Sequence, residues 1–237
     1  MICRKGRIVL PYTAILLNFF NFYKFFHCVI INNMEYLFLI SILIFSVVIH
    51  EVSHGTMAMY LGDSTAKYAG RLTLNPLKHL DPIGSILVPA FLIITTGMGF
   101  GWAKPVPINP LNFRDQKWGK LKVSIAGPAS NLIIALIFGL VLRFFPVIFT
   151  VSGLGLMFSY IIYINILLAV FNLVPIPPLD GSHILFTFLP PGTENIKIFL
   201  NQFGFFILLF IIFFLFRWLS FIVNWIFLLI VGTPITG

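Results

Sequence analysis

Long apolar runs separated by short polar stretches limit what this chain can fold into more than any other feature. The longest runs cover residues 36–60, 123–145, 154–174 and 198–231. A helix needs about 20 apolar residues to cross the hydrocarbon core of a bilayer. Charged residues make up only 9% of the chain, whereas a soluble domain is about a quarter charged. The sequence therefore predicts an all-α polytopic membrane protein.

Basic residues are concentrated in the polar loops and give the chain a formal net charge of +8. One basic loop follows residue 60, and a second covers residues 114–122. Neither is dense enough for a groove that follows a phosphate backbone, so we do not expect a nucleic-acid partner. Basic loops of membrane proteins lie mostly on the cytoplasmic side. We therefore expect a multi-pass protein of the cell membrane with a lipid bilayer as its surroundings.

The segment HEVSH lies near the end of the first apolar run. On a helix, His50 and His54 are one turn apart and project from the same face, as two ligands of one metal ion must. Glu51 lies beside them, where it could accept a proton from a water molecule at the metal. The alternative is a chance motif whose polar side chains only cap the end of the helix.

A catalytic zinc site usually takes three protein ligands, and Asp180 is the best candidate for the third. It lies in the proline-rich break PIPPLDG, which directly follows an apolar run. Non-helical backbone at membrane depth usually lines a cavity, and an ionisable residue there is a functional candidate. Asp180 could instead be a simple turn or cap residue. The remaining carboxylates lie before the helix, too near His54 in sequence or in polar loops: Glu35, Asp63, Asp81, Asp115 and Glu194.

Four stretches occur in an order that is typical of a known family. They are HEVSH at 50–54, GRLTLNP at 70–76, AGPASN at 126–131 and FNLVPIPPLDG at 171–181. HExxH alone is moderately specific, but HExxH joined to NxxPxxxLDG across apolar spans is strongly specific. Over about residues 36–189 the chain resembles the site-2 proteases, which are intramembrane zinc metalloproteases. Residues 101–110 resemble the form found in small bacterial members, and PDZ and CBS modules are not seen.

This resemblance implies cleavage of a peptide bond of a membrane protein, within or near the bilayer. It implies one Zn²⁺ held by His50, His54 and Asp180, with Glu51 as the base. It also implies that Asn172, the asparagine of NxxPxxxLDG, binds substrate or steadies the oxyanion. An intramembrane asparagine can equally well bond a neighbouring helix.

The resemblance divides the chain into three parts. We expect an N-terminal extension or anchor helix over 1–33, a metalloprotease core over 34–189 and C-terminal hydrophobic helices over 190–237. The core would place three transmembrane helices around the zinc site. The run 198–231 is too long for one untilted helix and predicts a bent helix or two short passes.

The two halves of the metal site constrain the topology. His54 and Asp180 can share an ion only if they lie at the same depth. If residues 83–100 crossed the membrane, Asp180 would end on the face opposite His54, and the basic loop 114–122 would be outside. We therefore predict that residues 83–110 form a re-entrant or non-crossing hairpin and that the active site faces the cytoplasm. Its proline-rich part, residues 102–110, predicts an extended edge strand that could bind substrate by strand addition.

Two other classes of function, a cation transporter and a non-catalytic membrane scaffold, fit the sequence less well. A zinc or other cation transporter would show polar residues on several spans and an internal repeat, and neither is evident. A non-catalytic membrane scaffold would not need Glu51. We interpret Asn131 as helix packing and Asn75 as a turn before proline, while His183 is close enough to Asp180 to act as a hydrogen-bond donor to it.

Overall fold

The computed structural model describes residues 33–96, 101, 103–151 and 153–232. Of the predicted extension over residues 1–33, residues 1–32 lie outside the described residues, as does Trp102. The described elements are α2 (Asn33–Tyr60), α3 (Thr65–Tyr68), η1 (Pro76–Lys78), η2 (Pro82–Leu87), α4 (Val88–Thr96), η3 (Pro110–Asn112), α5 (Gly119–Phe144), η4 (Pro146–Thr150), α6 (Leu154–Asn172), α7 (Asp180–Phe188) and α8 (Glu194–Val231). Among the described residues, four helices are long and apolar enough to cross a membrane, so the predicted all-α polytopic membrane fold is confirmed.

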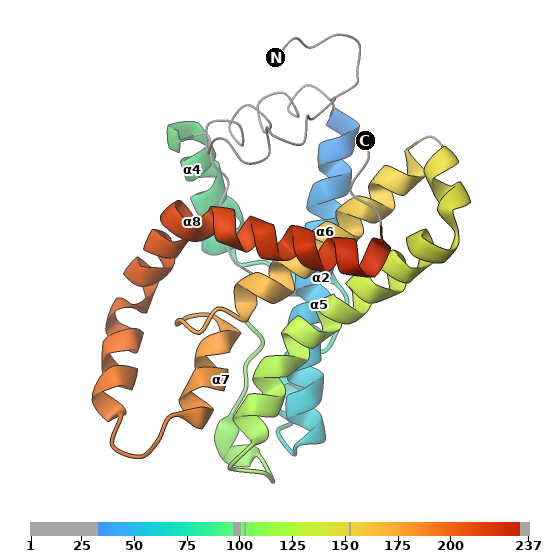
Figure 1. Cartoon of the computed structure of the whole chain (residues 1–237). Helices are drawn as coiled ribbons and strands as arrows, with labels where there is room; N and C mark the ends of the chain where they lie inside the picture. Colours follow the sequence, from blue (N-terminus) through green and yellow to red (C-terminus); the bar gives the residue numbers. More distant parts are fainter. Residues whose placement is uncertain (1–32, 97–100, 102, 152, 233–237) are drawn as a thin grey trace.

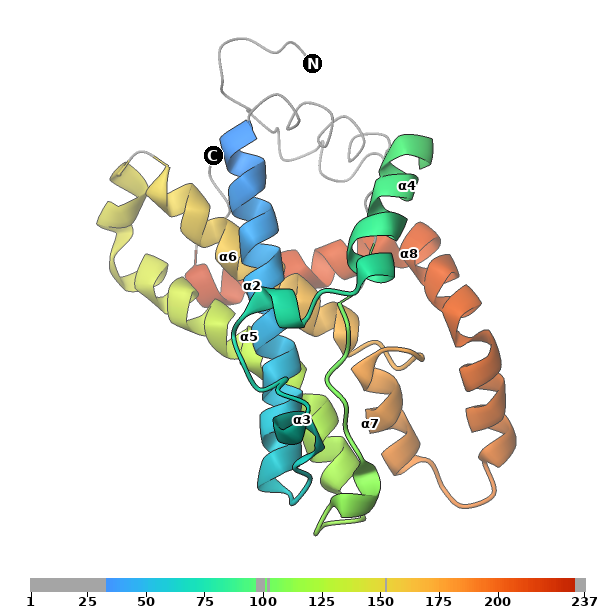
Figure 2. The same cartoon turned by 180° about the vertical axis from the view of Figure 1, so that it is seen from behind.

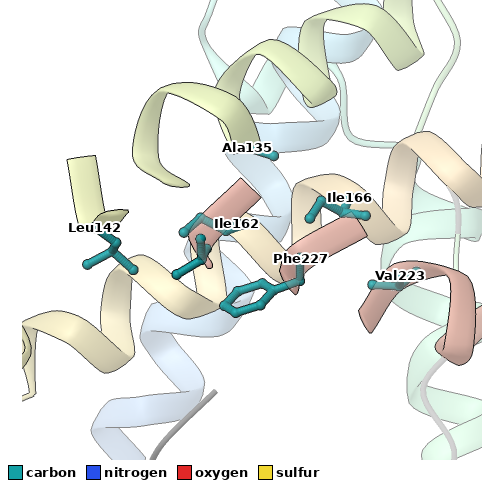
Figure 3. Packing of buried hydrophobic residues seen from close by; sticks show 7 residues of the cluster. Ala135, Leu142, Ile162, Ile166, Val223 and Phe227 are labelled. Carbon is teal, nitrogen blue, oxygen red and sulfur yellow. The ribbon is translucent and has the colours of Figure 1, made fainter. Parts of the chain in front are cut away.

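Three long helices, α2, α5 and α6, form the centre of the molecule (Figure 1). Helix α5 packs along both α2 and α6. The main apolar cluster lies between α5, α6 and the end of α8, as Figure 3 shows. Its buried members are Ala135, Leu142, Ile162, Ile166, Val223, Phe227 and Val231. This packing holds α5, α6 and the end of α8 together.

The segment between α3 and α5 leaves one end of α2 and returns to the same end (Figure 2). Helix α4 projects from the middle of the molecule, and the chain then runs back past η1, where the Lys104 N–H donates to His79 O at 2.9 Å. The return is complete at Arg114, whose N–H donates to Leu61 O at 2.8 Å. The described parts of this segment begin and end at the same end of α2, as the predicted non-crossing hairpin requires, while residues 97–100 of that hairpin lie outside the described residues.

The predicted strand over residues 102–110 is wrong for the part that the structure describes. Residues 103–109 are extended but belong to no strand. Pro105 and Pro107 have no N–H to donate, and the Lys104 N–H is bound to a loop carbonyl. The segment therefore has too few free main-chain donors for a regular ladder.

The C-terminal run is one bent helix. Helix α8 is continuous from Glu194 to Val231, and Figure 1 shows it rising beyond α7 and then turning to run across α6. Its first part, Glu194–Ile211, is long enough to cross a membrane, and the apolar stretch Trp218–Val231 is shorter. Arg143, at the end of α5, donates to Leu229 O at 2.8 Å and thereby caps the end of α8.

Candidate metal centre

Three side chains from distant parts of the chain meet beside α2. His50 and His54 lie one turn apart on α2, and Asp180 is the first residue of α7. Asp180 Oδ2 lies 3.1 Å from His50 Nε2 and 3.2 Å from His54 Nε2. The two imidazole Nε2 atoms are 3.0 Å apart. Both histidines are buried, each with 6% of its surface exposed.

This arrangement fits a tetrahedral zinc ion. Bonds of about 2.0–2.1 Å to zinc separate the ligand atoms of a tetrahedral site by about 3.3–3.4 Å. The three distances in the cluster are only slightly shorter. Two imidazoles and one carboxylate are also a donor set that zinc prefers. Among the described residues, this is the only group of three or more His, Cys, Asp or Glu side chains that could hold a metal ion.

Gly127 leaves the space that the centre needs. A Cβ built on Gly127 would lie 2.6 Å from His50 Nε2 and from His54 Cε1, and closer still to His54 Nε2. Helix α5 can therefore approach the two imidazoles only because this position has no side chain. Gly127 is the glycine of the AGPASN stretch. The sequence suggested only helix packing for this stretch, but the structure places its glycine in the site.

The other nitrogen of each imidazole is held by α5. His50 Nδ1 is 2.7 Å from Asn131 Oδ1, and His54 Nδ1 is 2.7 Å from Val123 O. Both acceptors require a proton on Nδ1, which leaves the Nε2 lone pairs directed towards Asp180 and available for a metal. Both candidate ligand histidines are thus held in the orientation that a metal site requires.

Asn131 belongs to a buried polar network that joins the three central helices. Its Nδ2 donates to Asn165 Oδ1 at 2.9 Å and to Ser46 O at 3.2 Å. Asn165 Nδ2 in turn donates to Ser46 Oγ at 2.9 Å. Asn131 and Asn165 are fully buried. These donations leave Asn131 Oδ1 as the acceptor for His50, so Asn131 orients a ligand as well as joining helices. A polar asparagine within a long apolar run was the signal in the sequence that could have indicated this role.

Glu51 is beside the cluster and is held by the returning segment. Its Oε2 accepts a hydrogen bond of 2.9 Å from the Val106 N–H. Glu51 is half-buried, and it follows His50 directly on α2. One carboxylate oxygen is therefore fixed by a main-chain donor. Residues 104–107 offer no further main-chain donor, because the Lys104 N–H is bound to His79 O and prolines occupy positions 105 and 107. The hypothesis of strand addition through these donors is thus not supported by this conformation.

The proline-rich break after α6 brings Asp180 to the histidines. Ile176 and Leu179 are buried against Leu208 of α8 and anchor the turn. A Cβ on Gly181 would collide with the main-chain carbonyls of Leu173 and Val174. The turn can therefore close onto the start of α7 only with glycine after Asp180. The Asp180 carboxylate faces the Nε2 atoms of the two histidines, as expected of a metal ligand more than of a helix cap.

Two other candidates are not hydrogen-bonded to the cluster in the part of the chain that the structure describes. Asn172 donates from Nδ2 to Leu168 O at 2.9 Å within its own helix. In the part of the chain that the structure describes, no hydrogen bond links Asn172 or His183 to Asp180.

Asp63 has a different task. It is fully buried, and its carboxylate accepts hydrogen bonds from the Asn109 N–H at 2.7 Å and from Asn112 Nδ2 at 2.9 Å. It also accepts from the Thr65 N–H and hydroxyl. Burial opposes its ionisation, but these hydrogen bonds outweigh it and hold the pKa of Asp63 below its usual value. Asp63 joins α3 to the segment that precedes α5.

Comparison with known proteins agrees with this site. The family model "Peptidase family M50" matches residues 148–211, which include α7 and Asp180. No solved structure matches the chain significantly.

Several curated bacterial and archaeal proteins are similar over most of this chain. The chain is 43% identical to "Putative zinc metalloprotease YwhC" of Bacillus subtilis, over 73% of this chain and 78% of that protein. It is 34% identical to "Putative zinc metalloprotease Rip2" of Mycolicibacterium smegmatis, over 77% of this chain and 70% of that protein. The identity to "Zinc metalloprotease MJ0392" of Methanocaldococcus jannaschii is 29%, over 66% of this chain and 36% of that protein. The chain therefore belongs to peptidase family M50, the site-2 proteases.

Proposed function

We propose that this protein is an intramembrane zinc metalloprotease that hydrolyses peptide bonds of transmembrane or membrane-associated proteins. The observation that carries the proposal is the meeting of His50, His54 and Asp180 within hydrogen-bonding distance of one another. Glu51 lies next to them on α2. Neither the family nor the names of the relatives favours a cation transporter or a non-catalytic scaffold.

We assign the binding of one Zn²⁺ to His50, His54 and Asp180. When bound, zinc supplies a Lewis acid that polarises a carbonyl and lowers the pKa of water towards about 7. Asn131 and Val123 O hold the imidazoles with their Nε2 atoms facing the centre. Gly127 keeps the space beside these atoms open.

Glu51 is the proposed general base. It accepts the proton of the attacking water and later delivers a proton to the leaving amine. The Val106 N–H fixes Oε2, so Oε1 is the oxygen that we expect to carry the proton. Burying a carboxylate within a membrane helix costs about 2.5–3.5 kcal/mol on insertion scales, and a catalytic role explains why it is present.

The substrate is expected to be a single transmembrane helix or its remnant. In such a helix every carbonyl is already hydrogen-bonded, so the scissile bond must be unwound before Glu51 can act. Asn172 is the proposed donor to the substrate or oxyanion. For that role its amide must exchange Leu168 O for the substrate.

We also propose that the active site faces the cytoplasm of a cell-membrane protein. Lys67 and Lys78 lie in the segment that follows α2. Lys117 lies just before α5, and Lys120 lies in the first turn of α5. A reporter fused at Gln116 should therefore read as cytoplasmic, and one fused at Val147 as extracytoplasmic. The reverse result at Gln116 would contradict this orientation.

The decisive experiment is co-expression with a panel of single-span membrane proteins. We expect wild type to convert at least one of them to a shorter fragment. Glu51→Gln should abolish cleavage and retain bound zinc, because the ligands are unchanged. Glu194→Gln is the matched control, since Glu194 has a 70% exposed side chain outside the site. Cleavage by Glu51→Gln would refute the assigned base.

A further inference from the structure

Arg71 is a buried cation that the proposed mechanism does not use. It lies between α3 and η1, and only 7% of its surface is exposed. Its Nη2 donates to Lys104 O at 2.7 Å and to Pro105 O at 3.4 Å. Arginine is rarely buried without a reason, and in the described part of the chain its Nε has no partner. The hydrogen bonds of the guanidinium therefore go to the main chain of one short segment.

His79 holds the same segment from a second side. The Lys104 N–H donates to His79 O at 2.9 Å, so both main-chain groups of Lys104 are engaged. His79 is itself 1% exposed, and its Nε2 lies 2.9 Å from Thr73 O. The loop 71–79 therefore binds both main-chain groups of Lys104, the carbonyl through the Arg71 side chain and the N–H through the main-chain carbonyl of His79.

Holding Lys104 in place also limits the motion of Val106, two residues later in the chain. Val106 follows Pro105, whose ring restricts φ and limits the motion of the segment. The Val106 N–H is the donor that fixes Glu51 Oε2 at 2.9 Å. Val106 is 5% exposed, and its Cγ1 would lie 2.9 Å from a Cβ placed on Gly55. Val106 therefore packs directly against α2, one turn after Glu51.

We propose that Arg71 is a positioning residue for Glu51. By holding the carbonyls of Lys104 and Pro105, it keeps the Val106 N–H where that group orients the carboxylate of the base. This inference rests on the proposed function, and it assigns to the GRLTLNP stretch a task in the reaction although Arg71 itself touches neither the metal ligands nor Glu51.

A positioning role and a structural role predict different results. Without the guanidinium, the segment 104–106 loses one anchor and Glu51 loses a fixed donor, while the metal ligands keep their own partners on α5. A misplacement of about 1 Å can lower a rate on the order of 100-fold. We therefore expect Arg71→Gln to lower kcat by about 10- to 100-fold, with KM within about twofold and one zinc per chain. Arg71→Lys should restore part of kcat, because a lysine can still donate to Lys104 O.

The test uses the full-length protein in proteoliposomes with a substrate that wild type cleaves. Arg114→Gln is the matched control, since Arg114 is an exposed arginine where the segment between α3 and α5 returns to the end of α2. Zinc content is measured on every sample, and hydrogen exchange is measured on peptides covering residues 104–106. We expect Arg71→Gln to speed exchange of the Lys104 and Val106 amides and to leave α2 protected.

Several outcomes would overturn the inference. Wild-type kcat in Arg71→Gln would do so, as would unchanged exchange at residues 104–106. Loss of zinc in both Arg71→Gln and Arg71→Lys would show that Arg71 is structural only. If wild type binds zinc but cleaves no substrate, the proposed function itself fails. If wild type cleaves, Glu51→Gln does not and Arg71→Gln equals wild type, the present inference fails alone.

Discussion

Adding one methyl group at Gly127 should remove zinc from the centre. A Cβ at this position would lie 2.6 Å from His50 Nε2, whereas ordinary van der Waals contact begins at 3.4 Å. His50 would have to move by about 0.8 Å (3.4 − 2.6), and His54 Nε2 by more. Ligand distances in a zinc site are kept to within about 0.2 Å. The required shift is therefore about four times what the coordination can absorb.

The imidazoles cannot move freely to relieve this clash. Their Nδ1 atoms are bound at 2.7 Å to Asn131 Oδ1 and to Val123 O, and both acceptors belong to α5, which carries the new methyl. Loss of a partner behind the ligands typically costs 10- to 100-fold in metal affinity. Direct displacement of both histidines should cost at least about 100-fold.

The assay is a competition titration of purified Gly127→Ala with a chromophoric zinc chelator. Gly139→Ala is the matched control on the same helix. A Cβ there also collides, with the Ile230 side chain, but far from the histidines. Alanine is a better helix former than glycine, so neither change weakens α5 through helix propensity. Gly127→Ala with a zinc affinity within about threefold of wild type would refute this account of the centre.

Three further predictions follow from the same contacts. Asn131→Ala should lower zinc affinity by about 10- to 100-fold and reduce the Tm, because His50 Nδ1, Asn165 and Ser46 O lose a buried partner; an unchanged Tm and affinity would contradict the network. Asp180→Asn should lose zinc and proteolysis together, measured as metal content and substrate cleavage, and full zinc occupancy would remove Asp180 from the ligand set. The pKa of Asp63 is lowered on folding from its usual value of 3.8. The ionised carboxylate therefore stabilises the fold fully at pH values above 3.8. This contribution is lost as the pH falls through the lower pKa of the folded state. Asp63→Asn should therefore lower the Tm at pH 7 and weaken its fall on acidification, and parallel Tm–pH curves for the two proteins would exclude this linkage.

The elements that the sequence predicted well are those set by local pattern. Apolar runs of membrane length became α2, α5 and α6, because a backbone in lipid must satisfy its own hydrogen bonds within a helix. The i, i+4 spacing placed His50 and His54 on one face. The requirement that they share an ion with Asp180 predicted the return of residues 83–110, and the structure brings Asp180 to within 3.2 Å of both.

The strand over residues 102–110 was predicted from the same local reasoning and is wrong for residues 103–109. Prolines favour extended backbone, but a strand also needs a neighbouring strand to pair with. Whether one lies alongside depends on the tertiary fold. The Val106 N–H finds Glu51 instead of a neighbouring strand. The length of the run 198–231 alone does not distinguish one bent helix from two short passes, and only the structure shows that α8 is continuous.

The sequence by itself determined the membrane class and the helical spans and predicted the candidate ligands, since these depend on residue type and local spacing. Only the tertiary structure decided that Asn131 orients His50, that Gly127 leaves room for an ion, and that Val106 holds Glu51. Each of these depends on which helix or segment lies opposite at a distance of a few ångströms. The physical reason is that a hydrogen bond or a steric clash across an interface is set by packing, and packing is encoded by the whole chain, not by any one motif.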